Sequence, residues 1–104
     1  MGYYTRYSLE VVKGNTDLIA ELVEENENAA FAIDEYGDSE ESCKWYEHDK
    51  EMRAFSSKHP STLFKLSGEG EESGDIWHTY YQNGKAQRCE AKIVFDDFDE
   101  NRLK

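Results

Sequence analysis

The Asn83-Gly84 pair restricts the possible folds of this chain more than any other sequence feature. It joins two segments of alternating polarity, residues 75–82 and 85–95. Both residue types tolerate positive φ, so the pair is typical of the type I′ turn in a two-residue β-hairpin. Such a turn also sets the register of the two strands. On one face the predicted partners are Tyr81 with Ala86, Thr79 with Arg88, Trp77 with Glu90, and Asp75 with Lys92.

The two faces of this hairpin differ in polarity. The more continuously apolar face is predicted to form the core and consists of Ile76, His78, Tyr80, Cys89, Ala91, Ile93 and Phe95. The outer face, away from the helices, is predicted to hold Trp77, Tyr81 and Arg88, together with Tyr4 from the first strand. Large aromatic side chains among mixed charges suit protein interfaces, so these four residues are a candidate contact surface. The alternative is that they form cross-strand pairs that only stabilise the sheet.

Sequence patterns also predict the other elements. Alternation predicts a strand over residues 3–12, and a second strand is expected at residues 63–66, followed by a flexible acidic stretch at 68–74. Apolar spacing predicts a helix capped by Thr16, interrupted at residues 26–28 and followed by a short helix or a continuation from Ala29. Another helix is expected over residues 47–58, with Met52 and Phe55 as its apolar stripe. Residues 43–46 suit either a short strand or the approach to that helix.

This order of elements predicts one α+β domain over residues 1–104. The expected architecture is a two-layer sandwich: a mainly antiparallel sheet with two to three helices on one face. A ferredoxin-like variant is compatible with the same order.

Residues 14–43 carry ten acidic side chains and no Lys or Arg, in a chain whose net charge is −11. A single-sign field of this density repels phosphates and attracts basic surfaces, and it exceeds what solubility requires. The tract is therefore a candidate partner-binding face, although a solvated helix face that keeps the protein soluble is the simpler interpretation. The residues assigned to this face are Glu21, Glu24, Glu25, Asp34, Glu35, Asp38 and Glu40.

Other kinds of site find little support in the sequence. No catalytic motif or cofactor-binding motif is present, and Cys43 and His48 lack the two further ligands that a zinc site needs. No metal or cofactor is therefore expected. The chain has neither a signal-peptide pattern nor a run of about 20 apolar residues, so a cytoplasmic location without membrane contact is expected. Cys43 and Cys89 are then expected to be free thiols.

Several segments carry a resemblance to a known group of proteins. They are MGYYTRY at 1–7, CKWYEH at 43–48, LFKLSGEGEE at 63–72, DIW at 75–77 and FDE at 98–100. Through them the whole chain resembles a set of small acidic proteins of unknown function that are typical of bacteriophage and prophage genomes. The resemblance implies an accessory protein that acts inside a bacterial host, and it supplies no catalytic residues. Small acidic phage proteins often block a host nucleic-acid enzyme or a defence complex, which is an analogy with a class.

The leading hypothesis is a non-enzymatic intracellular binding protein, a host-takeover or anti-defence factor whose acidic helix and loop engage a basic surface on a host protein. The natural target is a nucleic-acid-binding protein, with the acidic face imitating nucleic acid. Direct nucleic-acid binding is not expected, because the predicted outer sheet face has no surplus of positive charge. Two alternatives remain: a structural or self-associating homo-oligomer that uses the aromatic sheet face, and a small enzyme without a recognisable motif.

Overall fold

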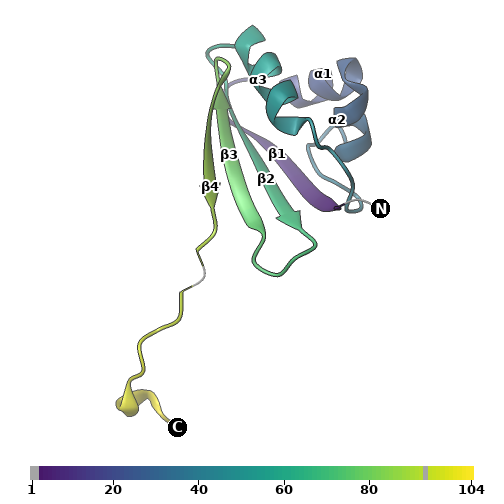
Figure 1. Ribbon diagram of the computed structural model, residues 1–104. Coiled ribbons are helices and arrows are strands. Elements are labelled where there is room, and N and C mark those ends of the chain that lie inside the picture. Colours follow the sequence, from purple (N-terminus) through teal and green to yellow (C-terminus); the bar gives the residue numbers. More distant parts are fainter. Residues whose placement is uncertain (1–2, 93) are drawn as a thin grey trace.

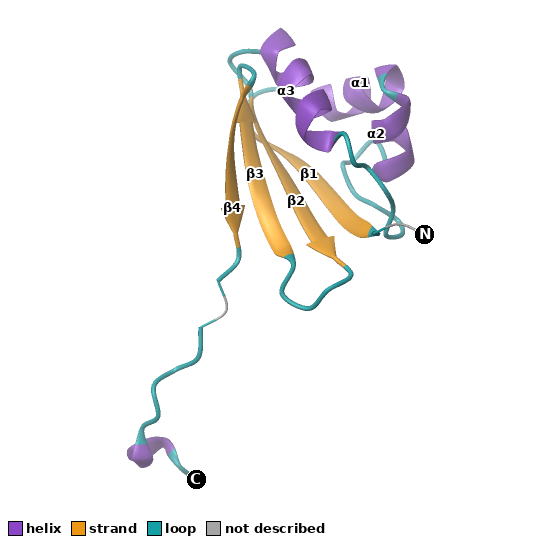
Figure 2. Ribbon diagram, in the orientation of Figure 1, coloured by secondary structure: helices purple, strands orange, loops and turns teal. Residues whose placement is uncertain are grey.

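The computed structural model describes residues 3–92 and 94–104. A four-stranded antiparallel sheet in the order β1-β2-β3-β4 carries the helices α1, α2 and α3 on one face (Figure 1, Figure 2). The strands are β1 (Thr5–Lys13), β2 (Leu63–Gly70), β3 (Ile76–Gln82) and β4 (Lys85–Glu90). The helices are α1 (Leu18–Glu25), α2 (Glu27–Ala32) and α3 (His48–Lys58), and a 3₁₀ helix, η1 (Glu100–Arg102), lies near the C-terminus.

This arrangement confirms the predicted two-layer α+β sandwich. The ferredoxin-like variant does not apply, because α1, α2 and α3 all lie between β1 and β2 and the strand order is sequential.

Asn26 separates the first two helices, which confirms the predicted interruption. Its backbone is extended, and its side-chain oxygen accepts hydrogen bonds from the N–H groups of Asn28 and Ala29, so it ends α1 and caps α2. The predicted cap at Thr16 is wrong: Asp17 occupies the N-cap position of α1 without a capping hydrogen bond from its side chain. Helix ends depend on local geometry that spacing alone does not specify.

The core lies between the sheet and the helices. Tyr7 and Leu9 of β1 and Phe64 of β2 face the helices and are buried. Met52 and Phe55 of α3 pack in the same cluster, as their spacing predicts. Other members are Leu18, Ile19, Leu22, Ala29, Ala32, Ile33, Trp45 and Leu66.

The predicted hairpin register is confirmed for Trp77 with Glu90, Thr79 with Arg88, and Tyr81 with Ala86. Both turn residues have the expected positive φ, 51° at Asn83 and 76° at Gly84. The turn is anchored to α3, because the Gly84 N–H donates to the Ser56 hydroxyl at 3.0 Å.

The assignment of the two hairpin faces is wrong. Trp77, Thr79 and Tyr81 face the helices and are buried, whereas Ile76, His78 and Tyr80 lie on the open face. A Cβ at Gly68 would lie 2.3 Å from the Trp77 ring, so the glycine leaves the space that the indole fills over β2. The Tyr81 hydroxyl donates to Asp49 of α3 at 3.0 Å. The large rings are therefore needed on the side where the helices pack.

Two predicted element boundaries also need correction. β2 continues to Gly70, so the irregular acidic stretch begins at Glu71 rather than at residue 68. β4 ends at Glu90, short of the predicted pair of Asp75 with Lys92. Phe95 is consequently exposed and is not a core residue, and Ile93 lies outside the described residues.

Candidate protein-binding face

Residues 34–43 form an irregular segment along the free edge of β1 (Figure 2), which we call the acidic strap. The Leu9 N–H donates to the Gly37 carbonyl at 2.6 Å, and the Ser39 N–H donates to the Tyr7 carbonyl at 3.0 Å. Thr5 and Cys43 exchange two backbone hydrogen bonds of 2.8 Å. Residues 43–46 were compatible with either a short strand or the approach to α3. They form no strand of their own, and only Cys43 makes an isolated bridge to β1.

Side chains of the acidic strap also hold it in place. The Asp34 carboxylate accepts hydrogen bonds from the N–H groups of Tyr36 and Asp38. The buried Ser39 hydroxyl accepts from the Tyr7 N–H at 2.9 Å and donates to the Ala32 carbonyl. Because backbone and side chains are both tied down, the strap presents its other acidic side chains from an ordered position.

Two hollows flank the acidic strap. One of about 400 Å³ lies between α2 and the strap, and its acidic lining residues are Asp34, Asp38, Glu40 and Glu41. The other, of about 660 Å³, lies between α1, β1 and the strap, with Glu10, Asp17, Glu35 and Asp38 as its acidic lining residues. No Lys or Arg is among the described residues that line either hollow.

An exposed aromatic side chain accompanies each hollow. Phe31 lines the first and is 86% exposed, and Tyr36 lines the second and is 75% exposed. We call these two residues and the seven acids of the hollows the acidic face. Because aromatic side chains are enriched at protein interfaces, the acidic face is a candidate protein-contact surface.

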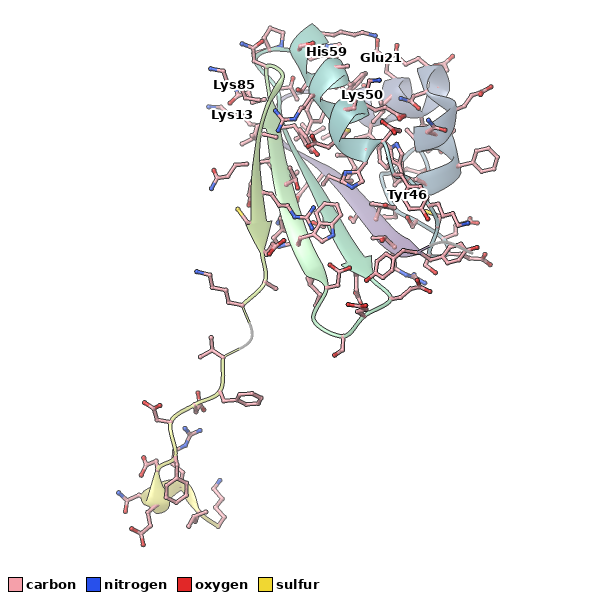
Figure 3. The ribbon with its side chains drawn as sticks, in the orientation of Figure 1. Lys13, Glu21, Tyr46, Lys50, His59 and Lys85 are labelled. Atoms are coloured by element: carbon pink, nitrogen blue, oxygen red, sulfur yellow. The ribbon has the colours of Figure 1, made fainter. Side chains whose placement is uncertain are left out.

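The structure brings four of the predicted partner-binding residues together on this face: Asp34, Glu35, Asp38 and Glu40. The three from α1 lie elsewhere. Glu21 approaches His59 at 3.7 Å (Figure 3), and Glu25 pairs with Lys58 at 3.3 Å, so both turn toward the end of α3. Glu24 is exposed on α1 and lines neither hollow.

The members of the acidic face differ in how free they are to contact a partner. Asp34 is engaged with backbone N–H groups, and Asp38 accepts from the Ser8 hydroxyl at 3.1 Å. Among the described residues, the other five acids of the face form no hydrogen bond or ion pair with their side chains: Glu10, Asp17, Glu35, Glu40 and Glu41. These five carboxylates are therefore the ones most available to a cationic ligand.

Sequence reasoning missed part of this face. Glu10 and Asp17 join it only through tertiary packing, because β1 and the start of α1 are brought beside the strap. Phe31 follows two alanines and precedes a third, so its helical face could not be judged from so short an apolar run. Tyr36 and Glu41 could have been assigned to this face from the sequence, because both lie within the acidic loop.

Cys43 lines the first hollow but does not add a reactive group to it. Its Sγ lies 3.6 Å from the carbonyl oxygens of Thr5 and Ala32. Burial raises the pKa of this thiol, so it stays protonated and behaves as a packing group. Cys89 is also a free thiol and is half-buried on the open face opposite His78 of β3.

The four residues predicted to form an aromatic sheet surface do not form one. Trp77 and Tyr81 are buried beneath the helices. Arg88 is on their side of the sheet, where its guanidinium lies 4.6 Å from the Trp77 ring centre and its Nε 3.3 Å from Glu90. Tyr4 is exposed, with the Lys44 ammonium 5.1 Å from its ring centre.

Within residues 3–92 and 94–104, no three His, Cys, Asp or Glu side chains are placed to share a metal ion. None of the helices described is both long enough and apolar enough to span a bilayer. Comparisons with protein-family models, with curated proteins and with solved structures found no match.

Proposed function

We propose that the protein is a non-enzymatic binding protein whose acidic face docks onto a basic surface of another protein. The observation that carries this function is the pairing of two acid-lined hollows with the exposed rings of Phe31 and Tyr36. Carboxylates would orient and accelerate the encounter with a positive surface. The two rings would supply the apolar contact that charge alone does not provide.

The chemistry of the face defines the class of partner. Seven acids around two hollows repel nucleic-acid phosphates but suit Lys and Arg side chains, whose alkyl stems can pack against Phe31 and Tyr36. A host nucleic-acid-binding protein is a natural target, because its own ligand-binding surface is basic. This role agrees with the resemblance to phage accessory proteins, and a cytoplasmic site of action in a bacterial host is part of the same proposal.

The proposal is tested by affinity capture from a bacterial lysate with the full chain immobilised, across a series of NaCl concentrations. We expect a basic protein to be retained at low salt and released as salt rises, because exposed charges are screened beyond about 10 Å at 0.1 M ionic strength. The captured protein is then purified, and its affinity is measured by titration against variants of the chain.

Two matched pairs of variants localise the binding. Glu40→Lys should weaken the affinity, whereas Glu72→Lys, in the turn after β2, makes the same change in net charge and should leave it unchanged. Phe31→Ser should weaken binding without any change of charge, whereas Tyr46→Ser, an exposed aromatic outside both hollows, should not. Salt-independent capture, or equal losses within either pair, would contradict the proposal.

A further inference from the structure

Residues 91–92 and 94–104 leave the globular body after β4 and extend away from it (Figure 1), and we call them the C-terminal arm. Four large apolar side chains of the arm are mostly exposed: Val94, Phe95, Phe98 and Leu103. Phe95 and Phe98 are 87% and 79% exposed. Exposed apolar side chains that lie close together in one segment indicate a surface that another molecule covers when the protein functions.

Acidic residues alternate with these apolar groups. Asp96 and Asp97 follow Phe95, and Asp99 and Glu100 follow Phe98. The arm also has local order, because the Asp99 carboxylate accepts from the Asn101 N–H at 3.0 Å and begins η1. Asp96 pairs with Arg102 at 3.0 Å. Residues 95–100 are therefore an acidic segment with apolar anchors, and they suit an apolar surface bordered by positive charge.

The open face of the sheet provides such a surface. The helices cover only the other face (Figure 2), and at the hairpin end the open face has a hollow of about 230 Å³ beside Leu63, Tyr80 and Lys85. A cavity of about 150 Å³ is enough to hold a benzene ring. No acidic residue is among the described residues that line this hollow.

Three lysines surround the hollow. Lys85 lines it, Lys13 pairs across strands with Leu63, and Lys65 pairs with Tyr80. Figure 3 shows Lys13 and Lys85 on the side of the sheet away from the helices. Glu10 is beside Lys65 on β1, and Glu69 lies toward the far end of β2. Around the hollow itself, positive charge therefore exceeds negative charge in a chain that is strongly acidic overall.

The direction of the arm favours a second copy of the chain over its own sheet. The arm starts at the end of β4, whereas the hollow lies near the start of β4, beside the Asn83-Gly84 turn. To reach its own hollow the arm would have to reverse at once, and residues 91–95 contain none of the turn-forming residues Gly, Pro, Asn, Asp and Ser. A second copy can receive the arm without this reversal, and two-fold symmetry lets each copy receive the other's arm.

We propose that two copies of the chain associate by exchanging C-terminal arms across their open sheet faces. Phe98 of each arm occupies the hollow beside Leu63 and Tyr80 of the other copy. The carboxylates that flank Phe98 lie against the lysines that surround the hollow. This contact uses neither Phe31 nor the acidic strap, so it is independent of the partner-binding role proposed above.

The mass of the full chain in solution, measured by light scattering and sedimentation over a wide concentration range, tests the association. We expect a dimer that dissociates on dilution and on addition of NaCl, because part of its attraction is electrostatic. Phe98→Ser should weaken the dimer about tenfold or more. Phe31→Ser makes the same substitution at an equally exposed site on the acidic face and should leave the dimer intact.

A charge exchange tests the register of the contact. Lys85→Glu and Asp97→Lys should each weaken the dimer, and the double variant should recover most of the loss. Lys50→Glu, on α3 at the covered side of the sheet, is the control for a change of net charge and should not weaken it beyond the general effect of charge. A chain that stays monomeric at all concentrations overturns the proposal, as does a dimer that is indifferent to Phe98→Ser or a monomer whose arm lies on its own sheet.

Discussion

His48 combines burial with an unusual lack of hydrogen bonding. In the part of the chain that the structure describes, its Nδ1 is the one buried side-chain nitrogen or oxygen without a partner. The imidazole stacks on Trp77 with ring centres 5.1 Å apart and also approaches Tyr7 and Trp45. Burial lowers its pKa below the ordinary value of 6.5, the nearby Arg88 lowers it further, and Asp49 and Glu51 oppose this shift. The neutral ring is therefore the form that the fold accommodates.

This shift predicts a loss of stability on mild acidification. The unfolded chain takes up a proton on His48 near pH 6.5, whereas the folded chain does so only at lower pH. The contribution of His48 is thus complete above pH 6.5 and declines as the pH falls toward the folded pKa. His48→Phe keeps an aromatic ring in the stack, so its free energy of unfolding should fall less between neutral pH and the folded pKa.

Denaturant titrations at several pH values measure the difference between the two proteins. At neutral pH the variant should also be more stable by about 1 kcal/mol, because it no longer buries an unpaired nitrogen. Equal pH dependence in the two proteins would show that His48 does not titrate as its surroundings predict.

Among the elements, the acidic strap protects the edge of the sheet as well as presenting the acidic face. An uncovered edge strand can pair with strands of other molecules. Backbone bonds from Gly37, Ser39 and Cys43 cover β1 from Thr5 to Leu9, and the charged side chains of Lys85, Arg88 and Glu90 lie on the opposite edge strand, β4. The order of the candidate binding face and the protection of the edge therefore depend on the same contacts.

Ser39→Ala should destabilise the protein by about 1–3 kcal/mol, because it leaves the buried Tyr7 N–H without a partner and the Ala32 carbonyl with only the weak thiol donor of Cys43. Amide exchange at Tyr7 should also become faster. Ser42→Ala, three residues further along in the same strap, removes an exposed serine and should have little effect on either measurement. The proposed role of the Ser39 hydroxyl would be wrong if the two variants behaved alike.

At the scale of the whole molecule, uncompensated charge opposes folding. The chain has a net charge of −11, and the four Lys or Arg ion pairs among the described residues are all between exposed side chains, which contribute little. Seven acids gather around the two hollows without a basic lining residue. The native state is therefore compact in spite of a concentrated self-repulsion.

Added NaCl should consequently raise the free energy of unfolding, because screening reduces this repulsion more than it weakens the exposed ion pairs. The gain should be smaller in a Glu40→Gln, Glu41→Gln double variant, in which two of the unpaired carboxylates are neutral. Thermal unfolding of both proteins over a salt series provides the measurement. If salt lowered the stability of the wild-type chain, attractive pairs such as Glu25 with Lys58 would dominate instead.

Local signals in the sequence were sufficient for several features of this fold. Asn83-Gly84 predicts the hairpin register because positive φ at two adjacent positions is a property of the turn residues themselves. Asn26 interrupts the helices because its side chain competes for nearby N–H groups. The alternation in β1 and the Met52–Phe55 stripe of α3 likewise follow from the periods of strand and helix.

By itself, the sequence determined the α+β class, the hairpin register and the concentration of negative charge, since each depends on neighbouring residues. Tertiary structure alone decided which hairpin face is buried, because Trp77 lies over Gly68 of another strand and Tyr81 reaches Asp49 of a helix. It also decided which acids share a surface. Glu10 and Asp17 join the acidic strap while Glu21 and Glu25 turn toward α3, and such long-range proximity leaves no trace in the order of residues.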